Sequence, residues 1–171
     1  FCLSRGLGDV YKRQRRAYAD NEELLDRGRQ WLTDVRPSHV WWGYVWQELH
    51  NARRDDGEIL VLARRWLQEA SPAHGGWSFV WEALHSANPG DENLVQRGRQ
   101  WLDEVSPDHG SWAHVWERLH RSRSGDQDLL NRGQRWLEEV HPNHGGWAFV
   151  WEGLRGVNPK DKELEDRGRQ W

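Results

Sequence analysis

The sequence predicts an all-α protein built as an α-solenoid of helix-turn-helix repeats, and three observations lead to this prediction. First, the motif AHGGWSFVWEALH at 73–85 returns as DHGSWAHVWERLH at 108–120 and NHGGWAFVWEGLR at 143–155, each time 35 residues later. Second, the tryptophans follow the same period. Third, the apolar residues within one period are spaced as on one face of a helix. An internal period of this length is typical of an array in which each repeat is one supersecondary unit.

All but one of the 14 tryptophans fall into three columns of equivalent positions, and the exception is Trp41. The first column contains Trp31, Trp66, Trp101, Trp136 and Trp171. The second contains Trp42, Trp77, Trp112 and Trp147, and the third Trp46, Trp81, Trp116 and Trp151. Aromatic rings interleaved with arginine could also stack on the bases of a single strand. The helical spacing on one face favours a structural core instead, and we expect Trp41 to be exposed.

The first helix of each repeat, helix A, is illustrated by the repeat at 90–124, in which Leu94, Gly98 and Trp101 share one helical face. A short side chain that accepts hydrogen bonds precedes each helix A, as expected for an N-cap. These predicted N-caps are Asn21, Asp56, Asp91, Asp126 and Asp161. Each helix A is predicted to end before a proline, which cannot continue it. These prolines are Pro37, Pro72, Pro107 and Pro142.

The second helix of each repeat, helix B, follows the proline. Trp112, Val115, Trp116 and Leu119 recur at the i, i+3, i+4 and i+7 spacing of an amphipathic helix. One hairpin cannot bury three tryptophans alone, so stability is expected from interfaces between stacked repeats. A recurring small residue inside helix A implies close approach of another helix, because glycine there otherwise only weakens the helix. This column is Gly28, Ala63, Gly98, Gly133 and Gly168.

The period divides the chain into equivalent segments. We predict repeats at 20–54, 55–89, 90–124 and 125–159, and a partial repeat, helix A only, at 160–171. Residues 15–19 are a lead-in. Residues 1–14 match no column, and GDVYKRQ at 8–14 resembles the translation of a transposon adapter used for sequencing libraries. We therefore predict a non-native leader at 1–14, and a metagenomic fragment of a larger protein.

The pattern LxxRGxxW in helix A, with Leu94, Gly98 and Trp101, followed by a second amphipathic helix and an NP turn, resembles the tetratricopeptide repeat family. The resemblance covers about 20–171. It implies a right-handed α-solenoid whose concave helix-A face binds a peptide or a partner domain. The chain departs from that family in its 35-residue period, its Pro-x-His motif and its many tryptophans. The period is also similar to that of pentatricopeptide RNA-binding repeats, whose composition is typically basic, unlike the net charge of −3 here.

Composition excludes several classes of protein. The charges are interspersed, so no global field recruits nucleic acid or an anionic membrane. No apolar stretch approaches the roughly 18–20 residues that span a bilayer. Cys2 is the only cysteine, which excludes intramolecular disulfides and agrees with a cytoplasmic location. No catalytic constellation is apparent, so we predict neither an enzyme nor a cofactor.

Histidines form two further columns. His39, His74, His109 and His144 could suggest a ladder of metal ligands. Stacked helices lie about 8–10 Å apart, whereas ligand-to-zinc bonds measure about 2 Å, so ligands in successive repeats cannot share an ion. We predict that these histidines close the turn and help to cap helix B. The second column, His50, His85 and His120, is predicted to be partly buried on helix B.

The outward face of helix A is the predicted partner-binding surface. It consists of Arg29, Arg64, Arg99, Asp103, Gln134, Glu138 and Arg169. Arginines flanked by carboxylates can grip a mixed-charge peptide through forked hydrogen bonds. The alternative is a solvated face with weak i,i+4 ion pairs. Under the binding interpretation, Arg64 and Arg99 contribute to partner capture and little to folding.

We therefore predict a protein–protein interaction scaffold. The alternative is a nucleic-acid sensor that reads phosphates through the arginine column of helix A. The chain ends within a helix A, so Leu164 and Trp171 are expected to lack part of their apolar surroundings. Because one end of a repeat array is complementary to its other end, we also predict weak head-to-tail self-association through this terminus.

Overall fold

The computed structural model describes residues 21–170, and every regular element in this range is an α-helix. The all-α prediction is confirmed. The chain forms two compact units, whose described parts are 21–80 and 81–170. The boundary falls inside the repeat predicted at 55–89. The predicted leader and lead-in, and Trp171, lie outside the described residues.

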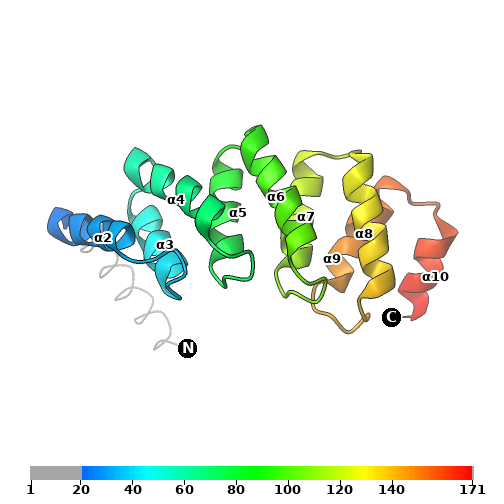
Figure 1. The fold of residues 1–171 in the computed structure, drawn as a ribbon. Helices are drawn as coiled ribbons and strands as arrows, with labels where there is room; N and C mark the ends of the chain where they lie inside the picture. The colour runs from blue at the N-terminus through cyan, green and yellow to red at the C-terminus, as the bar shows by residue number, and fades with distance from the viewer. Residues whose placement is uncertain (1–20, 171) are drawn as a thin grey trace, which may run out of the picture. The chain divides into compact units, whose positions relative to one another are not determined.

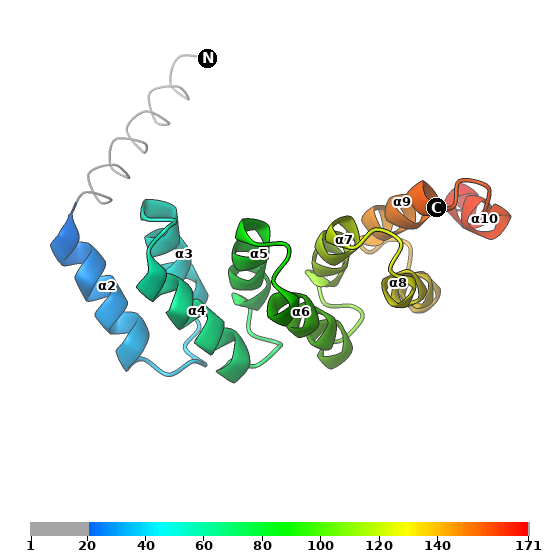
Figure 2. The same cartoon turned by 90° about the horizontal axis from the view of Figure 1, so that it is seen from above.

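A helices alternate with B helices along the chain (Figure 1). The A helices are α2 (Glu22–Asp34), α4 (Gly57–Glu69), α6 (Glu92–Glu104), α8 (Gln127–Glu139) and α10 (Lys162–Gln170). The B helices are α3 (Trp42–Ala52), α5 (Trp77–Ala87), α7 (Trp112–Ser122) and α9 (Trp147–Val157). In the first unit α3 packs against both α2 and α4. In the second unit α7 packs against α6, α8 and α9, and α9 also contacts α8 and α10, as the view in Figure 2 allows the reader to follow.

Local signals set the ends of the A helices as predicted. The side chains of Asn21, Asp56, Asp91 and Asp126 each accept a hydrogen bond from an amide of the first turn. Asp161 does the same for α10, from the amides of Glu163 and Leu164. α6 ends at Glu104, before the proline, with its C-cap residue extended. The predicted caps and proline boundaries are confirmed because both depend on residues that are adjacent in the chain.

Tryptophans join successive repeats in both directions. The indole N–H of Trp116 on α7 donates to the carbonyl oxygen of Leu129 on α8, at 2.7 Å. In return, Trp136 on α8 donates to the carbonyl oxygen of Pro107 at 2.8 Å and stacks on Trp112, with ring centroids 5.1 Å apart. Each ring is thus buried with its only polar group satisfied, which a buried indole requires.

The first unit repeats these contacts. Trp46 donates to the carbonyl oxygen of Ile59 at 2.9 Å, Trp66 donates to that of Pro37 at 2.8 Å, and Trp66 stacks on Trp42 at 4.6 Å. Within a hairpin, Trp42 donates to the carbonyl oxygen of Leu32 at 3.0 Å. The tryptophans therefore specify how the helices stack as well as filling the core.

Ten of the twelve predicted core tryptophans are buried. They are Trp42, Trp46, Trp66, Trp77, Trp81, Trp101, Trp112, Trp116, Trp136 and Trp147. Trp31 and Trp151 are only half-buried, which corrects the prediction for these two. Tryptophans in the column of Trp31 pack on the loop of the preceding repeat, and no described repeat precedes α2. On the other side, no described helix follows α10 to complete the cover of Trp151. Trp41 is exposed, as expected.

The small-residue column is where rings press on the A helices. A Cβ atom added at Gly98 or Gly133 would lie 2.6 Å from the Cζ2 atom of Trp81 or Trp116, respectively. A methyl group cannot be placed there without moving the ring. The predicted close approach is confirmed at these positions.

The histidines after the prolines close their turns, as predicted. Nδ1 of His144 accepts from the amide of Gly146 at 3.1 Å, and its ring meets Trp136 edge-on at 5.2 Å. His74 makes the equivalent bond to the amide of Gly76 at 3.0 Å, and its Nε2 lies 3.1 Å from the carbonyl oxygen of His39 in the preceding repeat. These histidines therefore also connect repeats.

Leu164 is buried rather than exposed, which corrects the expectation for the last helix. Its carbonyl oxygen accepts from the indole N–H of Trp151 at 2.7 Å, which connects α10 to α9. In the range 21–170, no helix has the length and apolar character required to cross a membrane.

Candidate protein-interaction surface

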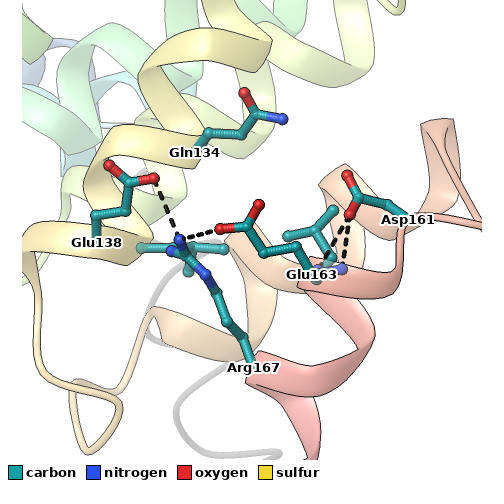
Figure 3. A pocket seen from close by; sticks show the side chains of 7 residues that line it. Gln134, Glu138, Asp161, Glu163 and Arg167 are labelled. Atoms are coloured by element: carbon teal, nitrogen blue, oxygen red, sulfur yellow. Dashed lines mark hydrogen bonds and ion pairs between the residues drawn. The ribbon is translucent and has the colours of Figure 1, made fainter.

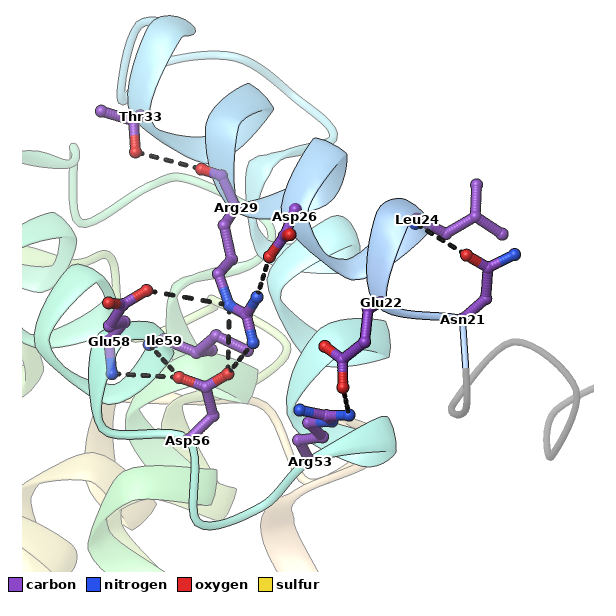
Figure 4. A network of polar contacts seen from close by, with 10 residues as sticks. All are labelled: Asn21, Glu22, Leu24, Asp26, Arg29, Thr33, Arg53, Asp56, Glu58 and Ile59. Carbon is purple, nitrogen blue, oxygen red and sulfur yellow. Dashed lines mark hydrogen bonds and ion pairs between the residues drawn. The ribbon is translucent and has the colours of Figure 1, made fainter.

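Two outward arginines of the A helices, Arg29 and Arg99, bind the next A helix. Arg29 on α2 donates to Asp56, the N-cap of α4, with Nε 3.1 Å from Oδ2, and also pairs with Asp26 (Figure 4). Asp56 simultaneously accepts from the amides of Glu58 and Ile59. Burial raises the pKa of Asp56, but the hydrogen bonds from Arg29 and from these amides outweigh burial and hold that pKa below its usual value.

The second unit contains the same arrangement between α6 and α8. Arg99 on α6 pairs with Asp126, the N-cap of α8, and lies 3.6 Å from Asp128. One turn further along α6, Asp103 pairs with Arg132 on α8. We call such a set of five positions, two on one A helix and three on the next, a joint.

The next joint, between α8 and α10, has the same five positions shifted by 35 residues, and only one of its substitutions changes a charge. Glu138 pairs with Arg167 at 3.2 Å, and Arg167 also pairs with Glu163 at 2.8 Å. Gln134 occupies the position of Arg99, and Asp161 that of Asp126. These residues line a cavity of about 120 Å³ (Figure 3).

These contacts change the interpretation of the predicted partner-binding residues. Arg29, Arg99, Asp103 and Glu138 each pair with the following A helix. Arg99 does not point freely into solvent, as the prediction of a small folding role assumed: its side chain is 20% exposed and pairs with an N-cap carboxylate. The physical reason is that stacking brings this side of one A helix against the amino-terminal turn of the next.

The other predicted residues face solvent. Arg64 and Gln134 are exposed. Arg169 is also exposed and pairs with Glu165 on its own helix, at 2.6 Å. The structure therefore places five of the seven predicted residues at joint positions: four of them pair with the next A helix, and Gln134 lies beside a cavity.

A surface that the sequence reasoning missed lies on the B helices. The equivalent positions Tyr44, Phe79, His114 and Phe149 form a column that we call the aromatic column. Tyr44, Phe79 and Phe149 are 44%, 45% and 40% exposed. The rings of Tyr44 and Phe79 lie 6.4 Å apart in the first unit, and those of His114 and Phe149 lie 5.2 Å apart in the second. The 35-residue spacing was the signal that could have revealed this column.

Trp41 and Val40 extend the exposed apolar surface of the first unit. Trp41 is 58% exposed, and its ring lies 5.5 Å from that of Tyr44. Val40 is exposed next to it in the chain. Carboxylates accompany the column: Glu48 on α3 and Glu152 on α9 are exposed, about one turn after Tyr44 and Phe149.

Two histidines of the second column are more buried than predicted, whereas His50 is partly buried, as predicted. His85 and His120 are 3% and 7% exposed, and they stack on Trp81 and Trp116 with ring centroids 4.7 and 4.9 Å apart. Burial lowers the pKa of both imidazoles, because the charged form loses its hydration. These residues belong to the core.

Comparisons of the chain with protein-family models, with curated proteins and with solved structures found no match. The resemblance to tetratricopeptide repeats therefore depends on the helix-A motif and on the alternating helices. Function has to be inferred from the surfaces of the repeats.

Proposed function

We propose that the chain is a protein-interaction scaffold, a right-handed, tetratricopeptide-like solenoid that binds a peptide or a partner domain. The observation that carries the proposal is the aromatic column. The core does not need these exposed rings, because the buried tryptophans already form it. Exposed apolar side chains are usually scattered singly on a monomer, whereas a contiguous group is typical of an interaction site.

The chemistry of the column indicates the kind of partner. Tyr44, Phe79 and Phe149 offer rigid apolar area, which loses little conformational entropy on binding. The exposed carboxylate of Glu152, about one turn after Phe149 on α9, favours basic groups. We therefore propose a partner segment in which apolar side chains are flanked by lysine or arginine.

The helix-A face remains part of the proposal, with a changed role. Since Arg29 and Arg99 already hold the carboxylates of the next A helix, a partner would have to displace those carboxylates to use them. The same competition faces a nucleic-acid phosphate, so these contacts lend no support to the nucleic-acid alternative. On this face, the joint that contains Gln134 has carboxylates but no arginine at the position of Arg99.

The test selects peptides against the whole chain from a random display library and measures their binding by fluorescence anisotropy. We expect saturable binding that the double variant Tyr44→Ser/Phe79→Ser weakens at least about tenfold, a loss of about 1.4 kcal/mol. The control is Val61→Ser, which removes an exposed apolar side chain of α4 outside the column.

Circular-dichroism melts establish that the variants stay folded. Equal affinities of the wild type and the double variant would contradict the proposed surface. Binding of a single-stranded oligonucleotide that weakens steeply with salt, in the absence of any peptide ligand, would favour the nucleic-acid alternative.

A further inference from the structure

We propose that the cavity between α8 and α10 binds the guanidinium group of an arginine side chain supplied by a partner protein. The inference rests on the proposed function only for the source of that arginine. Two other joints in the same chain show what fits in this position. There, the guanidinium groups of Arg29 and Arg99 pair with the N-cap carboxylates of Asp56 and Asp126.

The joint between α8 and α10 retains the acceptors and lacks the arginine. Asp161 accepts from the amides of Glu163 and Leu164 at 3.0 and 3.2 Å, as Asp126 accepts from its own first turn. The neutral Gln134 stands in the place of Arg99. Figure 3 shows the carboxylates of Asp161 and Glu163 and the amide of Gln134 around the cavity.

Charge quantifies what is missing. In the joint between α6 and α8, two arginines and three carboxylates give a net charge of +2 − 3 = −1. In the joint between α8 and α10, Arg167 alone stands against Glu138, Asp161 and Glu163, which gives +1 − 3 = −2. A single added cation would give this joint the same net charge as the joint between α6 and α8, which we call its sister joint.

The arrangement of the acceptors favours a guanidinium over other cations. The cavity of about 120 Å³ is several times larger than the roughly 10–15 Å³ that a cavity needs to hold one water molecule. In the sister joint Arg99 reaches two carboxylates, Asp126 and Asp128, whose equivalents here are Asp161 and Glu163. A planar fork of donors can bond two acceptors at once, whereas an ammonium is a point charge. No cluster of acidic or histidine side chains within 21–170 is arranged to hold a metal ion.

The test uses the whole chain and a short acetylated, amidated peptide in which one arginine is flanked by glycines. Two further probes replace the arginine by lysine or by citrulline, its neutral analogue. Amide NMR spectra follow Glu163 and Leu164, whose N–H groups bond Asp161. We expect saturable shifts with the arginine peptide and at least about tenfold weaker binding of the citrulline peptide, because the citrulline side chain carries no charge.

The variant Gln134→Arg should abolish these shifts, because its own guanidinium fills the cavity as Arg99 does in the sister joint. Gln134→Ala, which leaves the cavity open, should retain them. Arginine-peptide binding that survives Gln134→Arg unchanged, or equal binding of the citrulline peptide, would overturn the inference. So would the absence of saturable shifts, and the scaffold proposal would still stand if library peptides bound at the aromatic column.

Discussion

Gly133→Ala should destabilise the protein although alanine is the better helix former. The added Cβ would lie 2.6 Å from Cζ2 and 2.8 Å from Cε2 of Trp116. That ring is fully buried, donates to Leu129 at 2.7 Å and stacks on His120. Gly153 closes its other side, where an added Cβ would come within 2.9 Å of the ring. The indole is therefore held by contacts with both α8 and α9.

The expected magnitude follows from two opposing contributions. Replacing glycine by alanine inside a helix gains about 1 kcal/mol, whereas forcing a methyl group into a packed site costs about 1–3 kcal/mol. Ala63 stands at the equivalent position of α4, so this kind of contact between ring and helix can accommodate a methyl group, and the cost is that of shifting packed rings. We expect a net loss of about 1 kcal/mol in the free energy of unfolding.

Gly156→Ala is the matched control, because it makes the same substitution in α9 with no atom within 4 Å of the added Cβ. It should stabilise the protein by up to about 1 kcal/mol. Urea unfolding followed by circular dichroism measures both variants, and in thermal melts each kcal/mol corresponds to about 2–4 °C for a chain of this size. If Gly133→Ala stabilised the protein as much as Gly156→Ala does, the close approach of the Trp116 ring to α8 would not restrict the residue at position 133.

Two further predictions concern charge. Burial lowers the pKa values of His85 and His120, so the stability that they contribute is complete above the unfolded pKa of about 6.5 and declines as the pH falls below it. Urea midpoints measured at several pH values should show this decline, and the decline should be smaller in His120→Phe. A rise in stability on acidification would contradict the prediction. Asparagine caps a helix about as well as aspartate, so Asp161→Asn should change the free energy of unfolding by less than about 0.5 kcal/mol. Asp126→Asn should cost about 1–2 kcal/mol, because it also weakens the charged hydrogen bond from Arg99. Equal effects of the two variants in thermal melts would mean that the pair with Arg99 adds nothing to stability.

The sequence by itself determined the features that depend on neighbours in the chain. The all-α class, the caps at Asn21 and Asp126, and the ends of the A helices before the prolines follow from the residues of a single turn. The burial of most tryptophans also followed, because helical spacing places them on one stripe and large apolar rings on one stripe have to be covered.

Only the tertiary structure decided which groups meet across repeats. A period of 35 residues places Arg99 and Gln134 at equivalent positions. It does not reveal that Asp126, 27 residues after Arg99, lies within hydrogen-bonding distance of Arg99. Nor does it distinguish the buried column of Trp116 from the exposed column of Phe149, since both recur with the same spacing. The partner of a side chain in an array belongs to the next repeat, and the packing angle between helices, which no local pattern encodes, determines whether that partner is reached.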